Sequence, residues 1–409
     1  TGLNNEGIKM EQIRRTDKCY IIMPQHKEKR QIMDDKEKQK RAWAEINTEN
    51  LKHNLQELNH IMPKSCQMMA VVKANAYGHG ALEISRILAD EGVQAFAVAT
   101  LKEGIQLRKN GIKGEILILG MTEASNVSLI KKWDLTQTVV DFDHAERLQQ
   151  ENIKIKVHVK IDTGMERLGE PYYEWRNILK IYQMTNLSIT GIYTHLCVAD
   201  SLDPYDVAFT YGQIRRFYTI LNKIRMAHIV PGKIHIQSSY GLLNYPELHS
   251  DYVRVGIALY GALSNPNDTI KTKINLRPVL TLKAKIALVK NLQEGDTVGY
   301  GRNFTAKNKT RIAVVTIGYA DGIPRNLSCG KGSVIIKGKK APIIGNICMD
   351  QLIIDISEIK DTVSCGDEVI LIGEYGNQKI SPEMFAQNAE TITNEILSRI
   401  GERVEKIYL

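Results

Sequence analysis

Between about residues 68 and 259 the chain alternates short apolar runs with amphipathic segments. The runs are rich in β-branched residues, and the charged segments between them carry apolar residues at helical spacing, which predicts repeated βα units. Eight such runs occur, at residues 68–74, 95–100, 115–120, 136–141, 155–162, 187–196, 233–239 and 252–259. Because eight parallel strands close a barrel, we predict a (β/α)8 barrel. An open doubly wound sheet is the competing interpretation, but no GxGxxG fingerprint follows the first strand.

The pattern changes after about residue 274. Strand runs such as "VLTLKAKIALVKNL", "GSVIIKG" and "DEVILIG" are separated by Gly, Asn and Asp turns, which is typical of antiparallel sheet. The segment "SPEMFAQNAETITNEILSRIG" predicts one or two short helices before a final strand. We therefore predict an α/β fold: a TIM-like (β/α)8 barrel over residues 42–274, followed by a mostly antiparallel β domain over residues 275–409. The strand-like run at 42–47 is a candidate member of the β domain.

Residues 1–41 differ in composition from the rest of the chain. They hold 11 Lys and Arg residues against 7 Asp and Glu residues, in a chain whose net charge is +8. This composition predicts a polar, basic leader or linker. The chain begins at Thr1 rather than Met, so we expect either a piece of a longer polypeptide or a chain with an added remnant at its N-terminus. No basic face interleaved with aromatic residues is evident, so nucleic acid is not an expected partner.

The apolar and cysteine content narrows the class of protein. With 43% apolar residues, the chain can bury a large core, yet no apolar run approaches the roughly 18–20 residues of a membrane span. The six cysteines are scattered and form no CxxC pair. This pattern favours reduced thiols in the cytoplasm over a disulfide framework or a metal site.

Several residues with chemical potential are predicted at the mouth of the barrel. In "AVVKANAYGHG", Lys73 ends the first predicted strand, and active sites of such barrels lie at the C-terminal ends of their strands. His195 ends the sixth strand, Ser239 ends the seventh and Arg254 lies on the eighth. Taken singly, each has an ordinary interpretation, such as a Lys that reaches solvent or a Ser that caps a helix. Together, at one end of one barrel, they indicate a functional site.

A phosphate-binding cradle is predicted beside Lys73. Backbone amides near strands seven and eight commonly hold a phosphate in this fold, and here they belong to Gly256 and Ile257. The hydroxyls of Ser239 and Tyr77 can reach the same group. A lysine amine beside a phosphate cradle suggests a Schiff base with a phosphorylated aldehyde cofactor.

The motifs "AVVKANAYGHG", "HVKIDTGMERLG", "YTHLCVAD", "YVRVGIALYG", "VGYGRNF", "IGYADG" and "ICMDQ" together resemble the alanine racemase family of pyridoxal 5′-phosphate (PLP) enzymes. The resemblance extends from about Trp43 to Leu409. It implies a PLP-dependent amino-acid racemase that acts as a homodimer with shared active sites.

The resemblance assigns the two bases of a racemase. Lys73 is expected to hold PLP and to act as one base, and Tyr300 of a partner subunit as the opposing base, since racemisation needs proton transfer on both faces of the substrate. Arg167 is expected to assist Tyr300 and to bind the substrate carboxylate. Lys160 matches a lysine that is often carbamylated in the family; a neutral Lys160 or a nearby chloride is the alternative.

Further roles follow from the same resemblance. His195 is expected to pack against the pyridine ring of PLP, and Arg254 to donate a hydrogen bond to its nitrogen and keep it unprotonated, which favours racemisation over transamination. Other residues are expected to contact the substrate or line its channel: Met349 by its backbone, Tyr319, Arg325 and Asp200.

The sequence departs from the family at three positions. Asn394, in "TITNE", stands where alanine racemases usually carry a Tyr that binds the PLP phosphate. A short amide leaves space and a polar partner for a hydroxymethyl group, so we expect serine to be accepted alongside alanine; a role for Asn394 without substrate contact is the alternative. Asn346 replaces a frequent Arg of the channel, and Tyr240 adds bulk after Ser239.

The racemase part also resembles the serine racemases of vancomycin-resistance systems, which carry a membrane domain ahead of it. This implies a serine/alanine racemase that supplies D-amino acids for peptidoglycan precursors, in a cytoplasmic domain tethered to the membrane. The alternatives are an alanine racemase with little serine activity, a PLP-dependent decarboxylase of basic amino acids and a non-catalytic PLP-binding protein.

Overall fold

The computed structural model describes residues 40–409. The predicted leader, residues 1–41, therefore lies outside the described residues except for its last two positions. Across the described part of the chain, no helix combines the length and the apolar character that a bilayer-crossing segment needs.

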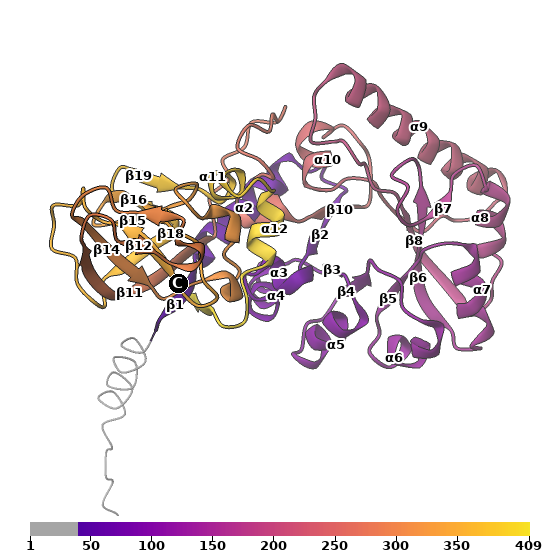
Figure 1. Cartoon of the computed structure of the whole chain (residues 1–409). Helices are drawn as coiled ribbons and strands as arrows, with labels where there is room; N and C mark the ends of the chain where they lie inside the picture. The colour runs from indigo at the N-terminus through magenta and orange to yellow at the C-terminus, as the bar shows by residue number, and fades with distance from the viewer. Residues whose placement is uncertain (1–39) are drawn as a thin grey trace, which may run out of the picture. The chain divides into compact units, whose positions relative to one another are not determined.

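Eight parallel strands close into a barrel (Figure 1). In chain order they are β2 (Gln67–Val71), β3 (Ala95–Val98), β4 (Glu115–Ile118), β5 (Thr136–Val139), β6 (Ile155–Asp162), β8 (Leu187–Tyr193), β9 (Lys233–His235) and β10 (Tyr252–Val255). The last strand pairs with the first, so the sheet has no free edge between them. The two-residue β7 (Glu170–Pro171) lies beside the end of β6. The predicted barrel is confirmed, and the open-sheet alternative is wrong.

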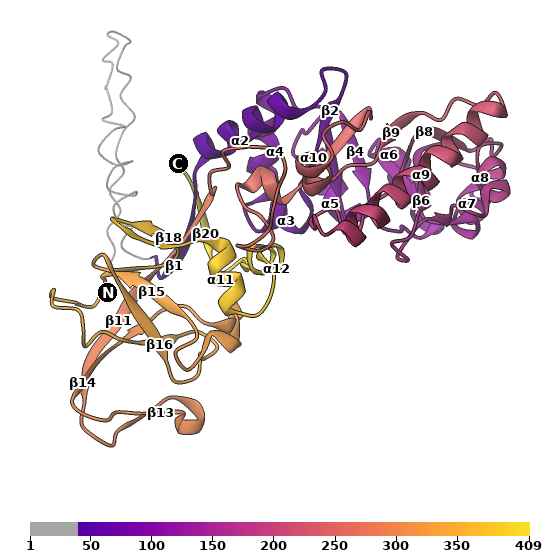
Figure 2. The same cartoon turned by 90° about the horizontal axis from the view of Figure 1, so that it is seen from above.

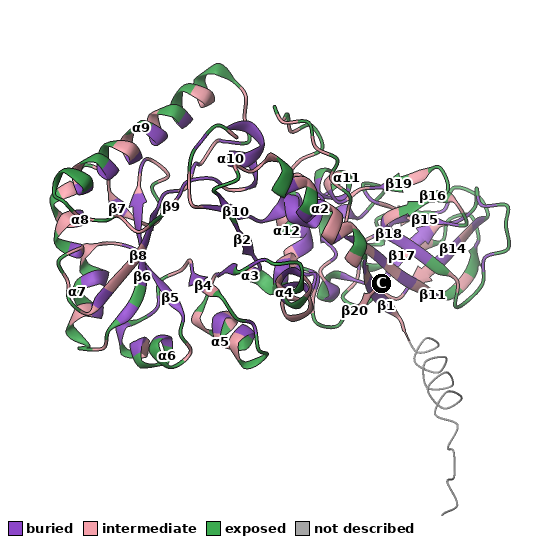
Figure 3. Ribbon diagram, turned by 180° about the vertical axis from the view of Figure 1, so that it is seen from behind, coloured by how far each residue is buried: buried purple, intermediate pink, exposed green. Residues whose placement is uncertain are grey.

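Helices connect the barrel strands and cover them from outside (Figure 1). They are α2 (Thr48–Ile61), α4 (Ala81–Asp90), α5 (Leu101–Lys109), α6 (Val127–Lys132), α7 (Phe142–Gln150), α8 (Trp175–Ile181) and α9 (Pro204–Met226). Two short elements, α3 (Lys73–Tyr77) and α10 (Ser239–Asn244), follow the ends of β2 and β9, and the backbone of α3 is not right-handed. Local signals fix their starts: Thr100 and Glu103 form a capping box before α5, and Asp141 caps α7. Each long helix has a buried face and an exposed face (Figure 3).

Seven of the eight barrel strands end before the apolar runs that predicted them, and β9 and β10 stop furthest short, by four residues each. Strand β9 ends at His235 rather than at residue 239, and β10 ends at Val255, after which Ile257–Tyr260 form a 3₁₀ turn. For β10 the physical reason is that Ser239 Oγ accepts hydrogen bonds from the amides of Gly256 and Ala258, which takes these groups out of the strand ladder. The segments after β9 and β10 therefore lie at the C-terminal end of the barrel, where the phosphate cradle is predicted.

The second sheet is mostly antiparallel, as predicted (Figure 2). Its strands are β1 (Ala42–Ile46), β11 (Leu280–Leu292), β14 (Thr310–Val315), β15 (Ser333–Ile336), β16 (Lys339–Ile344), β17 (Leu352–Asp355), β18 (Glu368–Tyr375), β19 (Gln378–Ile380) and β20 (Glu405–Tyr408). Strand β11 pairs with both β14 and β18, so six of the strands form a closed ring. The first strand of the described residues, β1, pairs with β11 and runs parallel to β20.

Smaller elements complete the β domain. A short hairpin joins β12 (Thr297–Val298) and β13 (Phe304–Thr305), and two helices, α11 (Pro382–Asn388) and α12 (Thr393–Ser398), precede β20. Helix α11 begins at a Ser381 cap with Pro382 in its first turn, which is a common start signal.

Candidate active site

A cavity of about 530 Å³ opens at the C-terminal ends of the barrel strands. Most of the residues predicted from the sequence line it: Lys73, Tyr77, Lys160, Arg167, His195, Asp200, Ser239, Tyr240, Arg254, Gly256, Ile257 and Asn394. They come from segments far apart in the chain that the barrel topology brings to one end.

Lys73 begins a left-handed turn that the sequence pattern does not predict. The four residues Ala74, Asn75, Ala76 and Tyr77 all have φ angles between 50° and 54°. Left-handed backbone costs a residue with a Cβ roughly 1–2 kcal/mol. Consecutive strained residues persist only where the surroundings over-determine them, and they concentrate at functional sites. The turn places both Lys73 and Tyr77 in the cavity wall.

Neighbouring elements hold this turn in place. The Glu103 carboxylate of α5 accepts a hydrogen bond from the amide of Ala74 at 2.7 Å. On the other side, a Cβ at Gly78 would lie 2.0 Å from the Leu397 carbonyl oxygen, and one at Gly80 would lie 1.8 Å from the Tyr408 hydroxyl. The two glycines of "AYGHG" are therefore needed for close packing against the C-terminal elements as well as for their positive φ angles.

We expect Ala74→Gly to stabilise the protein, because glycine adopts the left-handed conformation without strain and the Ala74 side chain is exposed. After the larger entropy of glycine in the unfolded chain is subtracted, the gain is about 0.5–1 kcal/mol in the free energy of unfolding. The matched control is Ala208→Gly at an exposed right-handed position of α9, which should lose about 1 kcal/mol. Urea denaturation measures both; equal losses at the two positions would contradict the strain argument.

Positively charged residues dominate the cavity, and burial lowers the pKa of its two lysines. Burial, with help from Arg167 and Arg254, lowers the pKa of Lys73, which increases the fraction of free amine that can act as a nucleophile. The same causes lower the pKa of Lys160 to about 8. This residue is only 5% exposed. A cavity with two lysines and two arginines favours anionic ligands such as phosphate and carboxylate.

The predicted phosphate cradle is assembled beside Lys73. Ser239 Oγ lies 3.0 Å from the amide nitrogen of Gly256. A Cβ at residue 256 would lie 2.7 Å from the Tyr77 hydroxyl, so only glycine lets Tyr77 approach the cradle. Burial raises the pKa of Tyr77 to about 12, so its phenol stays protonated and able to donate a hydrogen bond. Ile257 starts a 3₁₀ turn, whose first amides have no acceptor within the turn.

Arg254 is buried on β10 and donates in several directions. Its Nη1 lies 2.9 Å from His235 Nδ1, and its Nη2 donates to the Thr194 carbonyl oxygen at 2.8 Å and approaches His195 Nδ1 at 3.2 Å. Burial and the charge of Arg254 keep the pKa of His195 well below its usual value, so His195 is neutral. Within residues 40–409 we find no acceptor for Arg254 Nε, which leaves this donor available to a ligand in the cavity.

Arg167 lies on the loop that follows β6. The carboxylate of Asp162, the last residue of β6, accepts hydrogen bonds from the amides of Gly164, Met165 and Arg167 at 2.8–3.1 Å. These contacts give the loop a fixed path while the exposed Arg167 side chain lines the cavity.

Asn394 reaches the cavity from the start of α12. Its Oδ1 accepts a hydrogen bond of 2.9 Å from the Ser264 hydroxyl. Tyr240, unexplained in the sequence, is held by a hydrogen bond from the Ser264 amide and one to Asp268. The Asn394 side chain is thus oriented, and its amide nitrogen remains as a donor.

A second group of candidates does not line the cavity of its own chain. Tyr300, Tyr319 and Met349 are exposed by 72%, 41% and 52%, and they lie together on the β domain. Asn346 Nδ2 donates to the Tyr300 carbonyl oxygen at 2.7 Å, and the Cys348 carbonyl oxygen accepts from the Tyr319 amide at 3.0 Å. We call these residues, Tyr300, Tyr319, Asn346 and Met349, the exposed cluster. Arg325, in a 3₁₀ turn after Tyr319, also lies outside the cavity lining.

Comparison with known proteins identifies the family. Residues 46–264 match the alanine racemase N-terminal domain, and residues 279–408 match the alanine racemase C-terminal domain. The chain belongs to the alanine racemase family.

Individual relatives agree with this family assignment. An amino-acid racemase of Enterococcus faecalis is 46% identical over 90% of this chain and 51% of its own length, and a serine/alanine racemase of Enterococcus gallinarum is 42% identical over 89% and 51%. This chain thus spans about half the length of these curated relatives. The solved alanine racemase of Clostridium difficile 630 superposes with a TM-score of 0.83 at 35% identity, covering 90% of this chain and 95% of that one.

Alanine racemases depend on PLP, and the residues of this cavity fit that cofactor. The free Nε donor of Arg254 suits a pyridine nitrogen, and the cradle of Ser239, Gly256 and Tyr77 suits a phosphate. The partly buried Lys73 amine lies in the same cavity and suits an aldehyde. These features are properties of this chain's own geometry, independent of the family match.

Proposed function

We propose that this member of the alanine racemase family interconverts the L- and D-forms of serine and alanine by a two-base mechanism. The observation that carries the serine part is Asn394, an oriented amide in the cavity wall where the family usually has a tyrosine. The name of the Enterococcus gallinarum relative, a serine/alanine racemase, supports the same substrates, and the Enterococcus faecalis relative is named an amino-acid racemase.

Each cavity residue has a role in this proposal. Lys73 holds the cofactor covalently, and the cradle of Tyr77, Ser239, Gly256 and Ile257 holds its phosphate. When bound, PLP supplies an electron-withdrawing ring that makes the substrate α-proton acidic. Lys73 Nζ then transfers a proton on one face of the substrate, for which its lowered pKa is suited.

Proton transfer on the other face is proposed for Tyr300 of a partner subunit in a homodimer. Tyr300 is 72% exposed and lies outside the cavity of its own chain, as the whole exposed cluster does. A racemase site needs an opposing base, and a cluster that is exposed and lies outside the cavity of its own chain is placed to supply one to a second copy. In that dimer, Arg167 assists Tyr300 and binds the substrate carboxylate, Met349 contacts the substrate by its backbone, and the substrate channel is lined by Tyr319, Arg325 and Asp200.

Two cavity residues tune the cofactor site. Arg254 is proposed to donate from Nε to the pyridine nitrogen and to keep it unprotonated, since a guanidinium does not release its proton. His195, neutral and bonded to Arg254, is proposed to pack against the ring.

We also propose that Lys160 is carbamylated in the working enzyme. The pKa of this buried lysine is lowered to about 8, so part of the population carries a free amine that can react with carbon dioxide. A carbamate would place one negative charge among Lys73, Arg167 and Arg254. Intact-mass measurement of freshly purified protein tests for the modification; an unmodified Lys160 removes this part of the proposal.

Asn394→Tyr is expected to shift the serine-to-alanine ratio of kcat/KM towards alanine by roughly tenfold or more, because a phenol fills the space and removes the amide partner of the hydroxymethyl group. Both substrates are assayed in both directions on one preparation, by α-proton exchange in deuterated water. Asn388→Tyr, at the end of α11, is the matched control and should leave the ratio unchanged. An unchanged ratio in Asn394→Tyr leaves an alanine racemase with little serine activity as the better description.

The biological setting is part of the proposal. The two enterococcal relatives are about twice as long as the matched region, which supports a larger protein. We propose that its catalytic domain is cytoplasmic and tethered to the membrane. We propose that it supplies D-amino acids for peptidoglycan precursors, in a vancomycin-resistance system. We further propose that the chain divides by function near residue 274, with the barrel binding PLP and the β domain lending the exposed cluster.

A further inference from the structure

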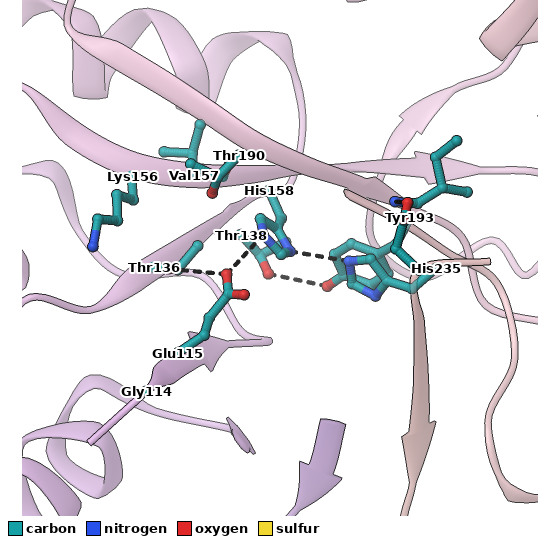
Figure 4. Close-up of polar contacts among 12 residues, drawn as sticks. Gly114, Glu115, Thr136, Thr138, Lys156, Val157, His158, Thr190, Tyr193 and His235 are labelled. Carbon is teal, nitrogen blue, oxygen red and sulfur yellow. Dashed lines mark hydrogen bonds and ion pairs between the residues drawn. The ribbon is translucent and has the colours of Figure 1, made fainter. Parts of the chain in front are cut away.

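Four polar side chains form a row through the interior of the barrel, from the cavity to its opposite end. Arg254 Nη1 lies 2.9 Å from His235 Nδ1, and His235 Nε2 lies 3.0 Å from His158 Nδ1. His158 Nε2 in turn lies 2.9 Å from Glu115 Oε1 (Figure 4). We call Glu115, His158 and His235 the relay.

The chemistry of Arg254 fixes which ring nitrogen carries the proton in each of the two histidines of the relay. A guanidinium can only donate, so His235 Nδ1 must accept and must carry no proton. A neutral His235 then carries its proton on Nε2 and donates it to His158 Nδ1. By the same reasoning, His158 carries its proton on Nε2, which faces the Glu115 carboxylate. The carboxylate is the terminal acceptor that this arrangement requires.

Packing holds the relay in place. Arg254, His158 and His235 are at most 4% exposed. The Tyr193 ring stacks on His235 with centroids 4.5 Å apart, and its hydroxyl lies 3.0 Å from Thr138 Oγ1 (Figure 4). A Cβ at residue 191 would lie 2.6 Å from His158 Nε2, so the glycine inside β8 makes room for the imidazole.

Glu115 connects the relay to solvent. It lines a second cavity, of about 610 Å³, together with Thr136, Lys156 and Tyr252. Burial would raise the pKa of Glu115, but hydrogen bonds from His158, Tyr252 and Thr136 outweigh it, and the pKa lies below its usual value. The carboxylate therefore stays ionised and can act as the fixed acceptor at the end of the row.

We propose that Glu115, His158 and His235 are positioning residues that fix the rotamer of Arg254 and direct its Nε into the active-site cavity. The inference rests on the proposed function in one respect, because that function assigns the ligand of Nε. If the carboxylate is lost, the proton of His158 can move to Nδ1, which then donates to His235 Nε2. His235 must in that case carry its own proton on Nδ1, the nitrogen that faces a donor on Arg254. Two facing donors repel, and Arg254 would turn away.

The first test measures the imidazole tautomers in cofactor-free protein. Nitrogen NMR of ¹⁵N-histidine-labelled chain should show both His235 and His158 with protonated Nε2 and bare Nδ1, assigned by His→Gln variants. In Glu115→Gln, whose amide can donate to His158, a second population with protonated Nδ1 should appear. A proton on His235 Nδ1 in the unaltered protein overturns the proposal.

The second test measures affinity for added PLP and turnover. In Glu115→Gln, the Kd for PLP should rise roughly tenfold, the scale of one lost hydrogen bond to a charged group, and kcat should fall with little change in KM. Glu115→Asp keeps the charge and should restore part of both. Gly191→Ala crowds His158 and leaves Glu115 intact, and it should change the Kd for PLP and kcat as Glu115→Gln does.

The matched control is Asp134→Asn. Asp134 lines the same second cavity and pairs with Lys156, but it lies outside the relay. Its positive φ of 47° suits asparagine, so the fold should be kept. Asp134→Asn should change neither the tautomers of His158 and His235 nor the Kd for PLP. If Glu115→Gln also changes neither, the relay has no positioning role. Racemase activity absent from the unaltered protein, with the tautomers as expected, would instead refute the proposed function alone.

Discussion

Lys73→Ala is expected to lower kcat/KM for both proposed substrates, serine and alanine, by on the order of 10⁴-fold or more, because one change removes the proposed covalent anchor of the cofactor and one of the two proposed bases. Lys73 is the amine that the left-handed turn presents to the cavity beside the phosphate cradle. Stability should change little, since the side chain makes no ion pair within the described residues and the turn keeps its Glu103 contact.

Racemisation assays and mass spectrometry after borohydride reduction check this result. The unaltered chain should carry the cofactor-derived mass on the peptide that contains Lys73, and the variant should carry none. Lys102→Ala, an exposed lysine of the neighbouring helix α5, is the matched control and should keep both activity and label. A label that moves to Lys160 in Lys73→Ala, with activity within tenfold of the original, would show that either amine of the cavity can serve.

Tyr300→Phe is expected to lower kcat for racemisation by roughly 10²–10⁴-fold, the usual contribution of a positioned proton-transfer group. The change removes only the hydroxyl of a side chain that is 72% exposed in its own chain, so folding and PLP binding should be unaffected. Tyr375→Phe, at the exposed end of β18, is the matched control and should retain full activity.

Mixing the two inactive variants tests whether Tyr300 serves a second copy. When Lys73→Ala and Tyr300→Phe chains are unfolded together and refolded in equal amounts, half of the dimers are mixed, and each mixed dimer regains one complete site. Activity should therefore return to about a quarter of the original value. If both residues served the same chain, every site would contain a defect and the mixture would stay inactive.

Much of the barrel and its site follows from the sequence because periodicity and chain order carry the necessary information. Eight apolar runs in alternation with amphipathic segments admit a closed parallel sheet, and such a sheet gathers the ends of its strands at one rim. Lys73, Ser239 and Arg254 follow or lie on different strands, yet the order of those strands is enough to bring them together.

The local backbone conformation of the site is harder to predict from the sequence. Nothing in the letters of "KANAY" indicates four left-handed residues, since alanine favours the right-handed helix; the turn is imposed by Glu103, Leu397 and Tyr408 from other elements. The early end of β10 likewise depends on Ser239, whose hydroxyl accepts hydrogen bonds from the amides that follow the strand.

The relay also could not be predicted from the sequence. The glycine within "ITGIY" is the one signal, because a glycine inside a strand often marks the close approach of another group. His158 and His235 look like ordinary core histidines until their partners are known. Their significance lies in contacts across the barrel, and such contacts between distant strands have no local pattern.

The pairing of β1 constrains the order in which the protein can assemble during synthesis. Ala42 lies opposite Ala284, and Ile46 lies opposite Tyr408, so the earliest described strand finds its partners only after the whole barrel and then the last strand have left the ribosome. Until then, the nascent chain carries β1 without its sheet, and the closing contacts are of very long range, which slows folding. Synthesis of the segment that forms β20, rather than growth of the barrel, is the event that allows β1 and β20 to pair.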